Sequence, residues 1–170
     1  MKACGPPAQG LGAAGFIVYD DTACMVEVAK AISRFLYVES CGQCPACKLN
    51  SRVITNRLEA IGAGQGTAHD VDVIGARLRR VTDGNRCYLP VQEQQVVASI
   101  LRAFPEDFAA HLEGQACHHG REFVVSKLVD IAGGQALYDE RQAFKQPDWT
   151  YADMSSTQLQ PVGQEPRARR

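Results

Sequence analysis

Three of the seven cysteines in this 170-residue chain stand within seven positions, in the spacing C-x2-C-x2-C. They are Cys41, Cys44 and Cys47. This spacing brings three thiolates to one point, where they can ligate a single metal centre. A four-iron cluster needs four thiolates, and three close cysteines with a distant fourth are one of its known arrangements. The fourth candidate is Cys87, in a loop-like stretch with Pro90 just behind it.

Composition narrows the class of protein further. The formal net charge of −1 gives no electrostatic reason to expect binding to nucleic acid or to an anionic membrane. No stretch approaches the roughly 20 apolar residues of a membrane span, and the first residues lack the apolar run of a signal peptide. We therefore expect a cytoplasmic protein, associated with a membrane only through a larger complex. In that reducing compartment, clustered cysteines indicate metal or redox ligands rather than disulfides.

Apolar residues recur at helical spacing through most of the chain. The predicted helices cover about residues 22–38, 51–60, 69–81, 91–104 and 106–112, with a final helical piece at 121–131. A β-type run at residues 15–19 is too short to form a sheet alone. The expected fold class is therefore all-α: a small helical bundle with a cysteine loop that holds an iron–sulfur cluster, and a short N-terminal strand.

Changes in composition suggest three parts. Residues 1–19 form a lead-in, rich in Gly, Ala and Pro, that ends in the short strand. Residues 20–145 form the helical iron–sulfur-binding domain. Residues 146–170 lose the apolar periodicity and end in a polar, basic stretch, so we expect a disordered tail.

The cysteine loop and its flanks carry a specific resemblance. The run Glu39-Ser40-Cys41-Gly42-x-Cys44-x-x-Cys47-Lys48 resembles the iron–sulfur-binding region of the flavoprotein (NADH-binding) subunit of respiratory complex I, NADH:quinone oxidoreductase. The same module occurs in NAD-reducing hydrogenases and NAD-dependent formate dehydrogenases. Residues 11–18, 24–26 and 99–108 agree as well, together with Cys87. The resemblance covers roughly residues 9–115 and extends more weakly to about 145.

The resemblance implies an electron-transfer module with one [4Fe-4S] cluster on the four cysteines, relaying electrons from or to a flavin on a partner. Family members oxidise NADH through a flavin held by a Gly-rich α/β domain. In this chain the Gly-rich residues 62–66 lie between two predicted helices with no preceding strand, so they are not a dinucleotide fingerprint. We therefore expect no FMN or NAD on this chain and no catalysis by the chain alone. The expected partners are a flavin/NADH-binding subunit and other iron–sulfur subunits of a dehydrogenase complex.

Two alternatives remain open at this point. The four cysteines could hold zinc in a helical interaction domain, although a Cys4 zinc site typically uses two CxxC pairs. The chain could also be an inactive, cluster-binding fragment of a larger dehydrogenase subunit.

Other chemistry-bearing residues have simpler interpretations. Cys24 is expected in the core of the first helix, Glu39 as a hydrogen-bond acceptor that shapes the loop, and Lys48 near the anionic cluster. His69 and His111 are expected on the surface. The run Cys117-His118-His119 is expected to form a polar turn. Arg77, Arg79 and Arg80 are expected to form a solvated basic face of a helix.

Overall fold

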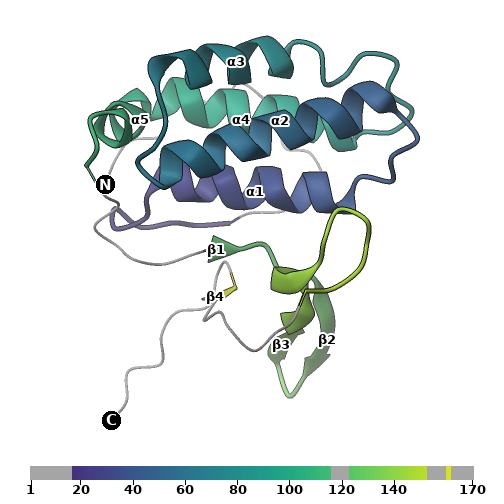
Figure 1. Cartoon of the computed structure of the whole chain (residues 1–170). Helices are drawn as coiled ribbons and strands as arrows, with labels where there is room; N and C mark the ends of the chain where they lie inside the picture. The colour runs from purple at the N-terminus through teal and green to yellow at the C-terminus, as the bar shows by residue number, and fades with distance from the viewer. Residues whose placement is uncertain (1–16, 116–122, 153–159, 162–170) are drawn as a thin grey trace.

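The computed structural model describes residues 17–115, 123–152 and 160–161. Most of this part of the chain is helical (Figure 1). The helices are α1 (Met25–Glu39), α2 (Pro45–Gly62), α3 (Ala68–Leu78), α4 (Leu89–Ala103), α5 (Pro105–Leu112) and the 3-10 helix η1 (Glu140–Phe144). The strands are β1 (Phe123–Val124), β2 (Leu128–Ala132), β3 (Gln135–Tyr138) and β4 (Gln160–Pro161).

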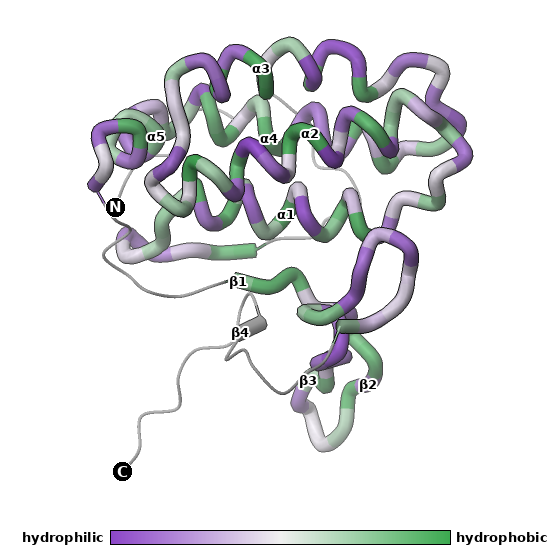
Figure 2. Tube along the Cα trace, viewed as in Figure 1, coloured by the Kyte–Doolittle hydropathy of each residue, from purple (hydrophilic) through white to green (hydrophobic). Residues whose placement is uncertain are grey.

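Helices α1 to α4 form an antiparallel bundle. α1 packs against α2 and α4, and α3 packs against the same two helices from the other side (Figure 1). The core side chains between them are fully buried, among them Ile54, Leu58, Ile74 and Val97. Figure 2 shows apolar and polar stretches alternating along each helix, as helices with one buried face require. The helical bundle expected from the periodicity is confirmed, but the all-α class holds only in part, because short strands follow the helices.

The first two helices differ from their predicted starts. α1 begins at Met25 rather than at residue 22, and the Met25 N–H donates to Asp107 Oδ2 of α5 at 3.2 Å. A carboxylate distant in sequence therefore caps this helix, which no local pattern reveals. α2 begins at Pro45 rather than at residue 51. Proline is well suited to the first helical position because its missing N–H would have no partner there, so the helix starts inside the cysteine motif.

The predicted helical piece at 121–131 is wrong. Residues Leu128–Ala132 form β2, which pairs antiparallel with β3. The turn between them is Gly133–Gly134, with φ angles of 58° and 75°. Two successive positive φ angles are the requirement of a tight hairpin turn, and glycine meets it without strain. The glycine pair therefore reverses the chain instead of ending a helix.

The two ends of the described chain also differ in detail from expectation. Residues 17–19, the described part of the predicted N-terminal strand, belong to no strand; a run this short has no partner to pair with. At the start of the predicted tail the chain turns back on itself, and Lys145 pairs with Tyr151 in an isolated antiparallel β-bridge. No helix among the described residues is long and apolar enough to cross a membrane.

Candidate functional site

The four candidate ligands lie at one end of the bundle. Because the helices alternate in direction, the α1–α2 and α3–α4 connections come to the same end (Figure 1). Cys41 is in the first connection, Cys44 is the N-cap of α2, and Cys47 is in the first turn of α2. Cys87 comes two residues before α4. The N-terminal ends of two helices therefore carry cysteines side by side, and their unpaired N–H groups favour negative charge.

The cysteines differ in exposure but are electrostatically linked. Cys41 and Cys87 are exposed, Cys44 is half-buried and Cys47 is buried, and all four are free thiols. Burial raises the pKa of the Cys47 thiol to about 11, and repulsion from Cys87, Cys44 and Cys41 adds to the rise. The four sulfurs thus share one region around Cys47. Cationic iron would reverse this repulsion, so metal binding here is expected to release protons.

The donor set fits a four-iron cluster. Gly42 has a φ of 78° and open space on its side-chain side, so only glycine holds this turn without strain. Among the residues that the structure describes, no three His, Cys, Asp or Glu side chains converge as one metal ion requires. A four-iron cluster instead bonds each thiolate to a different iron atom. Four free thiols around the ends of two helices match that chemistry.

The side chain of Lys48 links the cysteine loop to the segments around it. Its Nζ donates to the carbonyl oxygens of Tyr37 at 3.1 Å, Ser40 at 3.0 Å and Pro147 at 2.9 Å. The ammonium group also lies 4.9 Å from the centroid of the Tyr37 ring. All three of its hydrogens are used, so Lys48 joins the end of α1, the loop before Cys41 and the segment after η1.

Replacing Lys48 with methionine should therefore lower the free energy of unfolding by about 2 kcal/mol, because three carbonyl groups lose a charged donor. Urea denaturation of the two proteins measures the difference. Lys127→Met is the matched control: Lys127 forms an ion pair with Glu39 at 2.6 Å, and its side chain is 42% exposed. That change should cost less than about 1 kcal/mol. Equal losses in the two variants would contradict the clamping role of Lys48.

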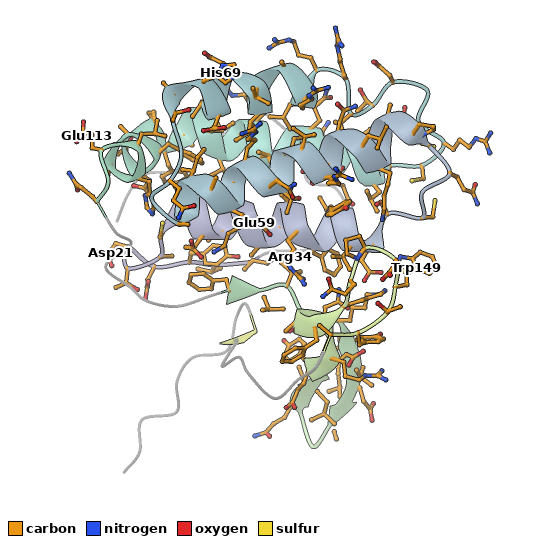
Figure 3. The ribbon with its side chains drawn as sticks, in the orientation of Figure 1. Asp21, Arg34, Glu59, His69, Glu113 and Trp149 are labelled. Atoms are coloured by element: carbon orange, nitrogen blue, oxygen red, sulfur yellow. The ribbon has the colours of Figure 1, made fainter. Side chains whose placement is uncertain are left out.

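A second set of contacts fastens residues 123–152, here called the C-terminal segment, to the same end of α1. Arg34 Nη2 donates to the carbonyls of Ala143 and Lys145, each at 3.0 Å, and Trp149 Nε1 donates to Val38 O at 3.0 Å. Figure 3 shows Arg34 pointing from α1 towards this segment, and Trp149 in the loop beside the end of α1. The segment therefore holds the backbone that leads into the cysteine loop.

Glu39 is the electrostatic centre of that attachment. Its carboxylate accepts from Lys127 at 2.6 Å, Lys145 at 2.8 Å and Gln142 at 2.9 Å. Burial alone would raise the pKa of Glu39, but these hydrogen bonds lower it to about 2. Glu39 is a hydrogen-bond acceptor, as expected, and these three donors lie in the C-terminal segment rather than within the loop.

The remaining sequence candidates lie away from the cysteines. Cys24 is buried, as expected, but as the N-cap of α1, and its Sγ lies 3.6 Å from His111 Nε2. The expected surface position of His111 is wrong: it is only 5% exposed, because α5 folds back over the start of α1. His69 is exposed on α3 (Figure 3).

The basic run is partly as expected. Arg79 and Arg80 are exposed, while Arg77 is half-buried and donates to Asn50 Oδ1 at 3.5 Å. The Cys117-His118-His119 turn lies outside the described residues.

One buried group escaped the sequence interpretation. Glu93 on α4 is fully buried and accepts a hydrogen bond from Ser33 Oγ at 2.6 Å. A signal was present: Pro90, Glu93, Val97 and Ile100 recur at helical spacing, and all four are buried. An acidic residue in an apolar stripe is a marker of a buried carboxyl group.

Residues 27–111, which contain all four candidate ligands, match the family described as the NADH-ubiquinone oxidoreductase-F iron-sulfur binding region. Over 107 residues the chain is 30% identical to the HndC subunit of the NADP-reducing hydrogenase of Solidesulfovibrio fructosivorans, covering 63% of this chain and 22% of that protein. It is 32% identical over 107 residues to the F 2 subunit of the NADH-quinone oxidoreductase of Rhizobium meliloti, covering 63% of this chain and 25% of that protein. It is 30% identical over 103 residues to the beta subunit of the NADP(+)-dependent formate dehydrogenase of Moorella thermoacetica, covering 61% of this chain and 15% of that protein. The chain thus spans a quarter or less of each of these relatives.

Proposed function

Because the chain belongs to the family of the NADH-ubiquinone oxidoreductase-F iron-sulfur binding region, we propose that it binds one [4Fe-4S] cluster and transfers electrons. The proposed ligands are Cys41, Cys44, Cys47 and Cys87. The observation that carries the proposal is the gathering of these four free thiols around the N-terminal ends of α2 and α4, at one end of the bundle. An iron–sulfur cluster would supply one-electron chemistry, with a potential tuned by burial and by hydrogen bonds to sulfur.

The protein's own residues prepare this site in three ways. Helix N-terminal ends favour the negative charge of a thiolate-bound cluster. The open side of Gly42 leaves room for the backbone to approach sulfur. Lys48 fixes the loop through backbone carbonyls, and its ammonium charge interacts favourably with Cys47 and Cys41. Contacts within the protein thus hold the cysteine loop, which limits the structural change that electron transfer must cause.

We further propose that the electrons come from, or return to, a flavin on a separate subunit. The relatives are named as subunits of NADH-quinone oxidoreductase, NADP-reducing hydrogenase and formate dehydrogenase. Hydride chemistry belongs to a nicotinamide or flavin cofactor and its binding domain. The described residues contain no Gly-rich strand–loop–helix unit that would bind such a cofactor. This chain would then be the relay, and FMN and NADH would bind to its partner.

The isolated, reconstituted chain should therefore show no NADH oxidation with ferricyanide or quinone and should take up no FMN. Dithionite should still reduce it and produce a paramagnetic signal, which electron paramagnetic resonance detects. NADH should reduce it only after a flavoprotein partner, such as the flavin-binding part of a related NADH-quinone oxidoreductase, is added. Turnover of NADH by the pure chain would overturn the relay assignment.

A further inference from the structure

A row of polar side chains runs from the cysteine site into the bundle core. Cys47, Ser51 and Thr55 are spaced four residues apart on α2, so they share one face of the helix. All three are buried, with exposed fractions of 7%, 0% and 2%. Cys47 and Thr55 are eight positions apart, which is roughly 12 Å along the helix. A core face would ordinarily carry apolar residues here, so a polar row needs a reason.

Glu93, on α4, is joined to this row through Ser33. Ser33 Oγ of α1 donates to Glu93 Oε1 at 2.6 Å and lies 2.8 Å from Thr55 Oγ1. Two buried atoms beside this network have no hydrogen-bond partner among the described residues: Glu93 Oε2 and Ser51 Oγ. A carboxyl oxygen left unpaired at full burial carries a large free-energy cost when ionised, and a smaller one when it holds a proton.

The charge state of Glu93 follows from its surroundings. Burial raises its pKa to about 8, and the hydrogen bond from Ser33 opposes only part of that rise. Its carboxyl group bonds Ser33 rather than a cysteine. The raised pKa of Cys47 comes first from burial and then from the other three cysteines, and the negative charge of Glu93 adds to it. Because electrostatic coupling is reciprocal, negative charge at the cysteine site disfavours the ionised form of Glu93, which is not a ligand.

Charged residues on the neighbouring helices are engaged elsewhere. On α1, Lys30 pairs with Glu27 at 2.6 Å, and Arg34 reaches carbonyls of the C-terminal segment. On α3, Arg77 donates to Asn50. α5 follows the far end of α4 and meets it there. Within the part of the chain that the structure describes, no hydrogen bond or ion pair joins a cation to the buried carboxyl group.

We propose that Glu93 is a proton-binding site coupled to the metal centre, so that each electron accepted there draws one proton from solvent onto an ionised Glu93 Oε2. The inference rests on the proposed cluster, with the electron supplied by a reduced flavin or, in the test, by dithionite. An added electron makes the cysteine site more negative, and inside a low-dielectric core that charge disfavours a nearby carboxylate. Proton binding to Glu93 removes this repulsion. Each reduction then adds one negative charge, the electron, and one positive charge, the proton.

The test is a redox titration of the reconstituted chain at pH values from 6 to 10, followed by electron paramagnetic resonance. The wild-type midpoint potential should be constant at low pH and fall above an onset near pH 8 or higher. The limiting slope is about 59 mV per pH unit, one proton per electron. Glu93→Gln should have a constant potential over the whole range. Infrared difference spectra above the onset should gain a carboxylic acid band on reduction in wild type only.

Two further variants make the result specific. Ser33→Ala removes the hydrogen bond that favours the carboxylate, so its onset should move to higher pH. Glu113→Gln alters an exposed glutamate just beyond the end of α5 (Figure 3), far along the bundle from the cysteine loop, and should keep the wild-type profile. A constant wild-type potential, or a slope that persists in Glu93→Gln, would overturn the proton coupling while leaving the cluster assignment intact. A chain that takes up no iron and sulfide would overturn both.

Discussion

Above pH 8, the Glu93→Gln variant of the cluster-free chain should be more stable than wild type by roughly 5 kcal/mol, and near pH 4 the two should be similar. Burial raises the pKa of Glu93 from 4.5 to about 8. Between these values the folded state binds more protons than the unfolded state. The contribution of Glu93 to the free energy of unfolding is thus fully present below pH 4.5 and is lost as the pH rises through about 8. That interval of about 3.5 pH units, at about 1.4 kcal/mol each, gives the magnitude.

Urea denaturation followed by circular dichroism, under anaerobic reducing conditions from pH 4 to 9, measures this difference. Comparing the two proteins cancels the titrating groups that do not interact with Glu93. Glu113→Gln should follow the wild-type curve, because its carboxyl group is exposed. A loss of this size approaches the whole stability of a small domain, so wild type should be visibly less stable at alkaline pH. Parallel curves for wild type and Glu93→Gln would show that the carboxyl group is not buried.

The second large effect concerns ligation. Cys47→Ala should abolish cluster assembly, because Cys47 is the buried thiol around which the other three gather. Cys87→Ala removes an exposed ligand from a separate loop. It should therefore lose the cluster or convert it to a three-iron form. Iron, sulfide and the paramagnetic spectrum of each reconstituted variant distinguish these outcomes.

Cys24→Ala is the matched control for loss of a cysteine. Cys24 is equally buried, but it lies at the N-cap position of α1, while the cysteine loop follows the end of that helix. This variant should bind iron and sulfide like wild type, even if its thermal stability falls. A full complement of iron and sulfide in Cys87→Ala would show that a different residue is the fourth ligand.

Local signals in the sequence predicted the bundle well because its helices are amphipathic over ten or more residues. The predicted α3 and α4 agree with the structure to within three residues at each end. The errors arose where one or two residues determined the local backbone structure. Pro45 begins α2 within the cysteine motif, and the Gly133–Gly134 pair turns an apolar run into a hairpin. Short apolar runs fit a helix or a strand equally well, so the turn residues decide.

Tertiary contacts were beyond the reach of sequence patterns. His111 looked like a surface residue because nothing nearby in sequence predicts its packing against Cys24. The contacts that Lys48 and Glu39 make with the C-terminal segment join residues about a hundred positions apart. The motif alone predicted Cys41, Cys44 and Cys47, since cysteine spacing is a local property, whereas Cys87 was the distant fourth candidate. Their support, and the buried Glu93, depend on which helices meet.

The most direct measurement for the central claim is the iron, acid-labile sulfide and zinc content of the chain after anaerobic reconstitution. A single [4Fe-4S] cluster predicts a brown protein with about four iron atoms and about four sulfides per chain, and a paramagnetic signal after reduction with dithionite. A colourless protein that binds one zinc ion and no sulfide would contradict the account.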